Sequence, residues 1–210
     1  MPRAHHPEIP YVKGAVDGSL SQHDFVQTQV QFFFAVEAYP QYLSQLAARS
    51  KSPGARRVLE ENVRDEEGEG RSAQSHAHTF RGLLEKLGVT AAETDATPKW
   101  ACVEAFNAGV REACTAGPEE LGLATVAAIE DLFTAISRDL GGAIVKRGWL
   151  AREEVVHYNV HEELDRVHAD ALYRELDAAK GDGVERTVTK GLEAGVTLMS
   201  ELYAGLLRGR

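Results

Sequence analysis

Four polar side chains share one face of a predicted helix near the carboxyl end of the chain. They are His157, His161, Asp165 and His168, at spacings of 4, 4 and 3 residues. At about 100° per residue these spacings keep them within a wedge of roughly 80°. Imidazole nitrogens and a carboxylate oxygen together suit a borderline divalent metal such as iron, manganese or zinc. A solvated polar face is the alternative, but three histidines and an aspartate in register favour a metal site.

A second set of candidates lies in the acidic segment NVRDEEGEGRSAQSHAHTF. Glu66, Glu69 and His76 share a face if one helix continues through Gly68 and Gly70. An acidic cluster of this kind commonly faces water instead, and the two glycines weaken the helix. Glu69 with His76 is therefore a candidate ligand pair, with a solvated surface as the alternative.

Two further carboxylates lie next to apolar residues. Glu130, in LATVAAIEDLF, has Val126 and Phe133 within one helical turn, and Glu37 follows the aromatic run of QFFFAVEAYP. A carboxylate on an apolar face is costly unless something pairs with it, and a bound cation would do so. The alternative is a position at the edge of the core, where each carboxylate reaches water.

Helical periodicity dominates the chain, and no alternating β-branched run competes with it. The predicted helices span residues 20–38, 42–48, 55–87, 98–116, 119–147, 151–179 and 184–207. Pro40 predicts a kink or stop after the first of them, and a kink is expected near Gly70. Residues 1–18 contain three prolines and read as an arm. We therefore expect an all-α single domain, a bundle of about seven helices.

Composition narrows the functional classes. The chain of 210 residues has a formal net charge of −9, which argues against nucleic acid as a partner. No apolar stretch approaches the roughly 20 residues of a membrane span, and no secretory signal is visible at the start. Two cysteines, Cys102 and Cys114, are too few for a disulfide framework. These features predict a cytoplasmic protein.

Three carboxylates and three histidines from three helices could hold a pair of iron ions in a helical bundle. The ferritin-like version of such a site needs a Glu-x-x-His pair on each of two helices. Glu154 with His157 forms one such pair, but helix 55–87 contains none. The ferritin-like pattern therefore fails.

The remaining pattern resembles the haem-oxygenase-like diiron oxidases and oxygenases. The likeness rests on Glu69 with His76, on Glu130, and on the motif His161-x3-Asp165-x2-His168, in that order. It extends over most of residues 19–179 through LSQHDFVQTQVQFFFAVEAYP and NVRDEEGEG. The resemblance implies a seven-helix haem-oxygenase-like bundle over residues 19–210. It also implies two Fe(II) ions bound by those six residues, dioxygen as co-substrate, and Glu66 or Glu37 as an additional ligand or substrate contact.

Members of this family oxidise amines at nitrogen, cleave C–C bonds of amino acids, or decarboxylate fatty acids. For this chain the expected substrate is a small amine or amino acid, in specialised metabolism, because Glu37 and the Glu66 region could pair with an ammonium group. The branch that forms para-aminobenzoate uses a lysine with no counterpart near Asp139 and Leu140. The resemblance is also compatible with an external electron donor and with a homodimer.

Three alternatives remain within the same fold. A haem-binding or haem-degrading protein would use His23 and the Gly141-Gly142 pair, but this leaves the three-helix ligand set unexplained. A thiamin-salvage hydrolase would need a cysteine nucleophile, and neither cysteine has a local activating signature. The third alternative is a binding protein without turnover.

Overall fold

Helices make up nearly all the regular structure of residues 2–209, which are the residues that the computed structural model describes. The α-helices are α1 Pro10–Asp17, α2 Gln22–Arg49, α3 Pro53–Glu66, α4 His76–Lys86, α5 Ala91–Ala96, α6 Ala101–Thr115, α7 Glu119–Lys146, α8 Val156–Ala178 and α9 Val184–Arg208. Single 3₁₀ turns lie at Ser72–Gln74 and Arg152–Glu154. No strand occurs among residues 2–209, so the predicted all-α class is confirmed. None of the described helices is long and apolar enough to cross a membrane.

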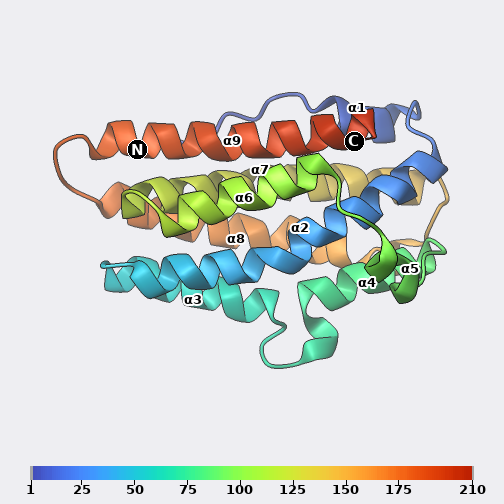
Figure 1. Cartoon of the computed structure of the whole chain (residues 1–210), viewed down its shortest axis with the longest axis horizontal. Coiled ribbons are helices and arrows are strands. Elements are labelled where there is room, and N and C mark those ends of the chain that lie inside the picture. The colour runs from blue at the N-terminus through green and yellow to red at the C-terminus, as the bar shows by residue number, and fades with distance from the viewer. Residues whose placement is uncertain (1, 210) are drawn as a thin grey trace.

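The long helix α7 lies in the middle of the bundle. It packs mainly against α8 and α9, and α1 also contacts α7 and α9. Figure 1 shows α9 with α1 along one edge of the bundle and α3 with α4 along the opposite edge. Residues from α3, α4, α7 and α8 can therefore meet in the interior, where α7 and α8 run side by side.

Two glycines bring α9 close to α7. A Cβ atom at Gly191 would lie 2.5 Å from the carbonyl oxygen of Leu121, and one at Gly195 would lie 2.6 Å from that of Thr125. The Thr125 hydroxyl donates a hydrogen bond to the Gly191 carbonyl at 3.1 Å. Only glycine permits this approach, because any side chain would collide with the facing backbone. The contact fixes α7 against α9 and leaves its other face for α8.

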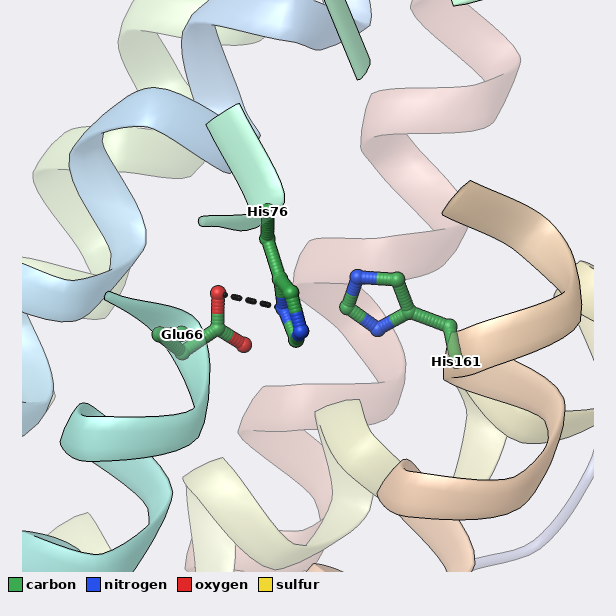
Figure 2. Close-up of side chains that lie close together, drawn as sticks. All are labelled: Glu66, His76 and His161. Atoms are coloured by element: carbon green, nitrogen blue, oxygen red, sulfur yellow. Dashed lines mark ion pairs between the residues drawn. The ribbon is translucent and has the colours of Figure 1, made fainter. Parts of the chain in front are cut away.

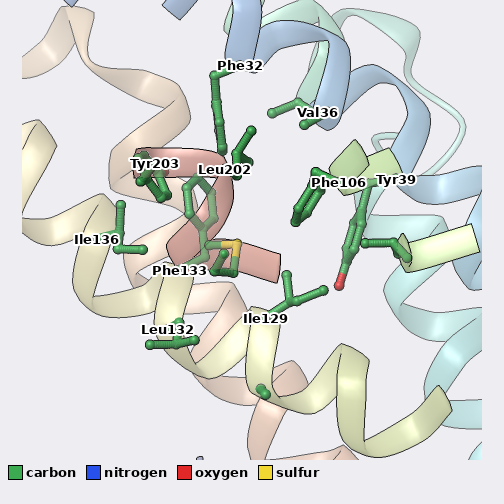
Figure 3. Close-up of a cluster of buried hydrophobic side chains, with 14 of the residues drawn as sticks. Phe32, Val36, Tyr39, Phe106, Ile129, Leu132, Phe133, Ile136, Leu202 and Tyr203 are labelled. Carbon is green, nitrogen blue, oxygen red and sulfur yellow. The ribbon is translucent and has the colours of Figure 1, made fainter. Parts of the chain in front are cut away.

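An aromatic cluster forms the core beside the polar interior. Phe32 on α2 lies with its ring centroid 5.4 Å from Phe133 on α7 and 5.6 Å from Tyr203 on α9. The Phe133 ring is in turn 5.0 Å from the ring of His161. Figure 3 shows Phe32, Phe133 and Tyr203 among the buried apolar side chains of this region. Apolar packing therefore reaches the polar residues of α8 and excludes water from them.

Helix α2 is continuous where the sequence predicted two helices, at 20–38 and 42–48. Pro40 lies inside it and cannot donate a backbone hydrogen bond, which costs a helix interior about 3 kcal/mol. Beyond the proline, Tyr42, Leu43 and Leu46 are buried. Burial of each such side chain contributes roughly 1.5–3 kcal/mol, so packing outweighs the proline defect.

Other predicted boundaries also change. The helix expected over 55–87 is interrupted: α3 ends at Glu66 and α4 begins at His76. Residues 1–18, expected as an arm, contain α1, which has Pro10 in its first turn and the fully buried Tyr11. Helix α5 was not predicted, although Thr90 and Glu93 form a complete capping box at its start.

Candidate metal centre

Six buried side chains meet in the interior of the bundle as two groups of three. The first triad is Glu66, His76 and His161, and the second triad is Glu130, Asp165 and His168. Within each triad one potential ligand atom from every residue lies within 4.8 Å of the others. All six residues are buried, with at most 5% of their surface exposed. Acidic residues are rarely buried to this extent unless they are paired or bind a metal.

The uninterrupted helix α8 supplies half of this cluster. His161, Asp165 and His168 lie on one face of it, as their spacings of 4 and 3 predict. Glu130 comes from the middle of α7, which packs along α8. The other two residues occupy helix ends, Glu66 as the last residue of α3 and His76 as the first of α4.

In the first triad the His76 ring lies between the Glu66 carboxylate and the His161 ring (Figure 2). Nδ1 of His76 is 2.8 Å from Oε2 of Glu66, but the two groups are not aligned for a hydrogen bond. The rings of His76 and His161 have their centroids 4.2 Å apart. Nε2 of His161 has no hydrogen-bond partner. The three groups therefore lie close together without forming aligned hydrogen bonds with one another.

Residues of α2 and α3 support the second triad. Oε1 of Glu130 accepts hydrogen bonds from the Tyr39 hydroxyl at 3.0 Å and from Nδ2 of Asn62 at 2.8 Å. Nε2 of His168 is 2.9 Å from Oδ2 of Asp65, and its Nδ1 is 3.6 Å from Oε2 of Glu130. A carboxylate that holds one imidazole nitrogen fixes the ring and directs the other nitrogen toward a metal. Asp65 is in this position relative to His168.

Asp165 connects the two triads. Its Oδ1 is 2.8 Å from Nδ1 of His161, while its Oδ2 is buried without a hydrogen-bond partner. Nitrogens of His76, His161 and His168 in the same cluster also lack a hydrogen-bond partner, although those of His76 and His168 face the carboxylates of Glu66 and Glu130. A buried polar atom without a hydrogen bond costs roughly 1–3 kcal/mol, so four such atoms in one place need an explanation. A carboxylate oxygen and three imidazole nitrogens fit divalent cations such as iron.

The charges of the cluster are shifted strongly by burial and by one another. Burial opposes the positive charge of His168, but the neighbouring Glu130 carboxylate raises the pKa of His168 to about 10. Burial raises the pKa of Asp165 well above its usual range, and Glu130 adds to this. Burial and the neighbouring His76 lower the pKa of His161 to about 3. Without a metal, protons on His168 and Asp165 thus offset the acidic charge, and a divalent cation would replace them.

Glu69, predicted as a ligand, lies outside the cluster. Its side chain is 65% exposed and forms an ion pair with Arg71 at 3.0 Å. The predicted common face with His76 required a continuous helix, but Gly68 adopts a positive φ of 75° and turns the chain. A Cβ atom at Gly68 would lie 2.5 Å from the Arg71 carbonyl oxygen, so the turn requires glycine. Glu66, the alternative from the same segment, occupies the buried position.

Glu37 and His157 also lie outside both triads. The Glu37 side chain is 47% exposed and lies 3.3 Å from the guanidinium of Arg81, so the structure does not bring it together with the two triads. His157 is fully buried, with its ring centroid 4.6 Å from that of Phe80 and its Nδ1 3.3 Å from the Thr79 hydroxyl. It is a core residue beside the centre.

A small cavity adjoins the two triads. Its volume is about 40 Å³, and the side chains that line it include Phe32, Val36, Phe106, Ile129, Phe133 and Met199. Glu66, Glu130, His161 and Asp165 border it on the polar side. A water molecule needs roughly 10–15 Å³ of such space, so the cavity holds only a small group. Apolar walls around convergent polar groups are typical of a site that excludes water from its chemistry.

The residues proposed for the alternative functions lie elsewhere. Cys114 is fully buried, and burial raises the pKa of its thiol to about 12. Burial also raises the pKa of Cys102, and neither cysteine borders the cavity. His23 is exposed at the start of α2, and Gly141 packs against Tyr158 of α8. The structure thus gives neither an activated thiolate nor a buried histidine at the position expected for haem.

Comparisons with known proteins agree with a metal centre. A family model described as iron-containing redox enzyme matches residues 27–198. The 4-aminobenzoate synthase of Chlamydia muridarum is 26% identical over 195 residues, which cover 90% of this chain and 81% of that protein. The 4-aminobenzoate synthase of Chlamydia trachomatis serovar D is 27% identical over 197 residues, covering 93% and 82%.

Solved structures confirm the fold. A domain of unknown function with a heme oxygenase-like fold from Shewanella denitrificans has a TM-score of 0.80 at 13% identity, covering 96% of this chain and 85% of that one. A TenA homologue from P. horikoshii has a TM-score of 0.74 at 16% identity, covering 96% and 90%. These likenesses confirm the predicted haem-oxygenase-like bundle. The match of the family model over residues 27–198 shows that the chain belongs to the iron-containing redox enzyme family.

Proposed function

We propose that this protein is a non-haem diiron oxygenase or oxidase that uses dioxygen to oxidise a small amine or amino acid, by N-oxygenation or by oxidative C–C cleavage. The observation that carries the proposal is the pair of buried triads, Glu66 with His76 and His161, and Glu130 with Asp165 and His168. Membership of the iron-containing redox enzyme family supports iron as the metal.

The donor set suits two ferrous ions. Three carboxylates, from Glu66, Glu130 and Asp165, would neutralise most of the charge of two dications, and three imidazoles would complete the protein ligands. When bound, the iron pair would supply electrons and open coordination positions for the reduction of dioxygen. Six protein side chains shared between two ions leave such positions free, as a catalytic site requires.

The surrounding residues hold these ligands in place and keep the site dry. Tyr39 and Asn62 donate to one oxygen of Glu130, and this leaves Oε2 turned toward His168. Asp65 accepts from Nε2 of His168 and thereby fixes its ring. The aromatic wall beside His161 restricts bulk water, so the charges at the centre act in a medium of low dielectric.

The size and lining of the cavity support a small substrate. A space of about 40 Å³ accepts only the reacting part of a molecule, which argues against a long acyl chain lying wholly inside it. With Glu37 outside the site, the carboxylates that border the cavity are Glu66, Glu130 and Asp165. The carbon atoms of a small substrate would face the apolar wall, and its reacting group would face the metal centre.

Formation of 4-aminobenzoate is a second candidate, favoured by the names of the two chlamydial relatives. The lysine associated with that branch has no counterpart near Asp139 and Leu140 in the last third of α7. Analysis of products for 4-aminobenzoate would decide between this activity and the oxidation of a separate small molecule.

The test is a substrate screen with the iron-loaded protein. Protein purified under nitrogen and loaded with ferrous iron is mixed with dioxygen and with a panel of amines, amino acids and fatty acids. Oxygen uptake is measured, and products are identified by mass spectrometry. We expect uptake to be stimulated by an amine or amino acid, and the product mass separates N-oxygenation from C–C cleavage. Uptake no faster than that of the His161→Ala variant with every compound would contradict the proposal.

A further inference from the structure

The buried cavity and a groove on the surface share one lining side chain, Phe106 of α6. The groove lies between α6 and α9 and has a volume of about 670 Å³. Phe106 lines this groove and also the cavity beside the two triads, while only 5% of its own surface is exposed. Figure 3 shows its ring near Tyr39 and Ile129 at the edge of the buried cluster. A single aromatic ring therefore borders both the outer space and the inner space.

Three other surface grooves do not connect to the cavity in this way. The groove between α1 and α7, the one between α2 and α3, and the one between α2 and α5 share no lining residue with the cavity. The groove between α6 and α9 is thus the one of these four that offers a route inward.

Small residues line much of this groove. Ala101 and Ala105 on α6 and Ala204 and Gly205 on α9 border it, beside the larger Leu198 and Leu202. Phe106 is the large side chain at its inner end that also reaches the cavity. A change of rotamer at one side chain moves far fewer atoms than a shift of a helix, so this ring can admit small molecules without opening the bundle.

The mouth of the groove suits a small polar molecule. Glu201 and Arg208 lie there, and both residues are exposed. Charges of both signs next to an apolar floor match a small molecule that carries an ammonium group, a carboxylate or both. This matches the substrate class proposed above.

We propose that the substrate reaches the metal centre through the groove between α6 and α9, and that Phe106 is the specificity-determining residue that limits the size of molecules entering the cavity. The role of this route in substrate entry rests on the proposed function. The route itself is a property of the fold and can be tested without metal.

The test measures how fast a small reagent reaches the interior of the metal-free protein. Diethyl pyrocarbonate modifies imidazole nitrogens, and His161 lines the cavity with an Nε2 that has no hydrogen-bond partner. Modification of His161 is followed by peptide mass spectrometry, with the exposed His23 as internal reference. We expect Phe106→Ala to accelerate modification of His161 about tenfold, as for a barrier lowered by ~1.4 kcal/mol, and Phe106→Trp to slow it.

Two matched controls separate entry from general loosening. Phe25→Ala removes an equally buried ring that packs against Trp149 and does not line the cavity, so it should leave the rate at His161 unchanged. In the wild-type protein, a bulky maleimide on Cys102 should slow modification of His161, because Cys102 lines the groove. The Cys102→Ser variant should lose this effect, since Cys114 is fully buried.

Equal rates at His161 in Phe106→Ala and Phe25→Ala would overturn the proposed route. If Phe106→Ala fails to fold, an unchanged rate in both Phe106→Trp and the maleimide-labelled protein would overturn it instead. Iron content is measured separately on the same variants. Protein that binds no iron but shows the predicted rates would contradict the proposed function and leave the route standing, whereas the opposite result would contradict the route alone.

Discussion

The two triads of the metal centre differ in how they are supported. In the second triad, Glu130 and His168 come from the interiors of the long helices α7 and α8. Tyr39 and Asn62 hold Glu130, and Asp65 holds His168. Each of these contacts joins a ligand to a side chain on another helix. The positions of the ligand atoms are thus fixed before a metal arrives.

The first triad has weaker support. Glu66 ends α3 and His76 begins α4, and the nine residues 67–75 between them contain three with positive φ, namely Gly68, Glu69 and Gly70. Glu66 and His76 contact each other at 2.8 Å without an aligned hydrogen bond. Ligands at helix ends beside a turn move more easily than ligands in the middle of helices.

This contrast shows that the same types of ligand can form two different sites within a single cluster. In one the ligands are held rigidly by neighbouring side chains, and in the other they can move. We expect the second triad to bind metal more tightly and the first triad to be filled last. The predictions below test this difference, and they run from the largest expected effect on metal binding to the smallest.

Asp165→Ala should abolish binding at both triads. Asp165 belongs to the second triad and its Oδ1 also contacts His161 of the first, so its loss removes a ligand and a support together. Iron content should fall from two ions per chain to near zero. Asp170→Ala is the matched control on the same helix, since Asp170 is 40% exposed and pairs with Arg3. If Asp165→Ala still bound two iron ions, the cluster would not be the metal centre.

Glu66→Ala should remove the metal of the first triad and leave about one iron per chain. Glu69→Ala should leave two iron ions per chain, because the Glu69 side chain is 65% exposed and pairs with Arg71. Iron per chain, measured after dialysis against metal-free buffer under nitrogen, separates the two variants. The reverse result would restore Glu69 as the ligand and would mean that residues 67–75 rearrange on metal binding.

Asp65→Ala should weaken metal binding at the second triad without abolishing it. Loss of a carboxylate that orients a histidine ligand typically costs 10- to 100-fold in metal affinity. Ferrous iron titration under nitrogen measures the change, and Glu67→Ala is the control because Glu67 is the exposed neighbour of Glu66. An affinity unchanged by Asp65→Ala would show that the hydrogen bond to His168 does not prepare the site.

His157→Ala should have the smallest effect on iron. His157 is fully buried but belongs to neither triad, so the variant should keep both metals, whereas His161→Ala should lose the first. His157→Ala should lower the free energy of unfolding by about 1–3 kcal/mol, because it leaves a cavity beside Phe80. Iron content and urea unfolding of the metal-free protein measure the two effects. Equal loss of iron in the two variants would show that His157 is also a ligand.

Sequence reasoning succeeded where the candidate residues lie within one uninterrupted helix. His161, Asp165 and His168 could be placed together from their spacing, because α8 is continuous from Val156 to Ala178. Glu130 was noticed because a carboxylate beside apolar neighbours needs a partner. The all-α class followed from helical periodicity along most of the chain.

The same reasoning was wrong where it assumed that a helix continues. The choice of Glu69 depended on counting residues through Gly68 and Gly70, and the angular rule fails once the chain leaves the helix after Glu66. The roles of Asp65 and Asn62 were also missed, since they arise from contacts between helices that no local spacing encodes. One signal was available, because Asn62 lies four residues before Glu66 and so shares its face of α3.

The most direct test of two metal sites in this chain is a ferrous iron titration of the metal-free wild-type protein under nitrogen, followed by thermal unfolding. We expect two iron ions per chain, the tighter one bound by the second triad and therefore retained in Glu66→Ala. Binding to the folded state alone should add about 2.7 kcal/mol of stability when free iron is ~100 times Kd. A melting temperature that does not change with iron, or a shift equally large in Asp165→Ala, would contradict the account.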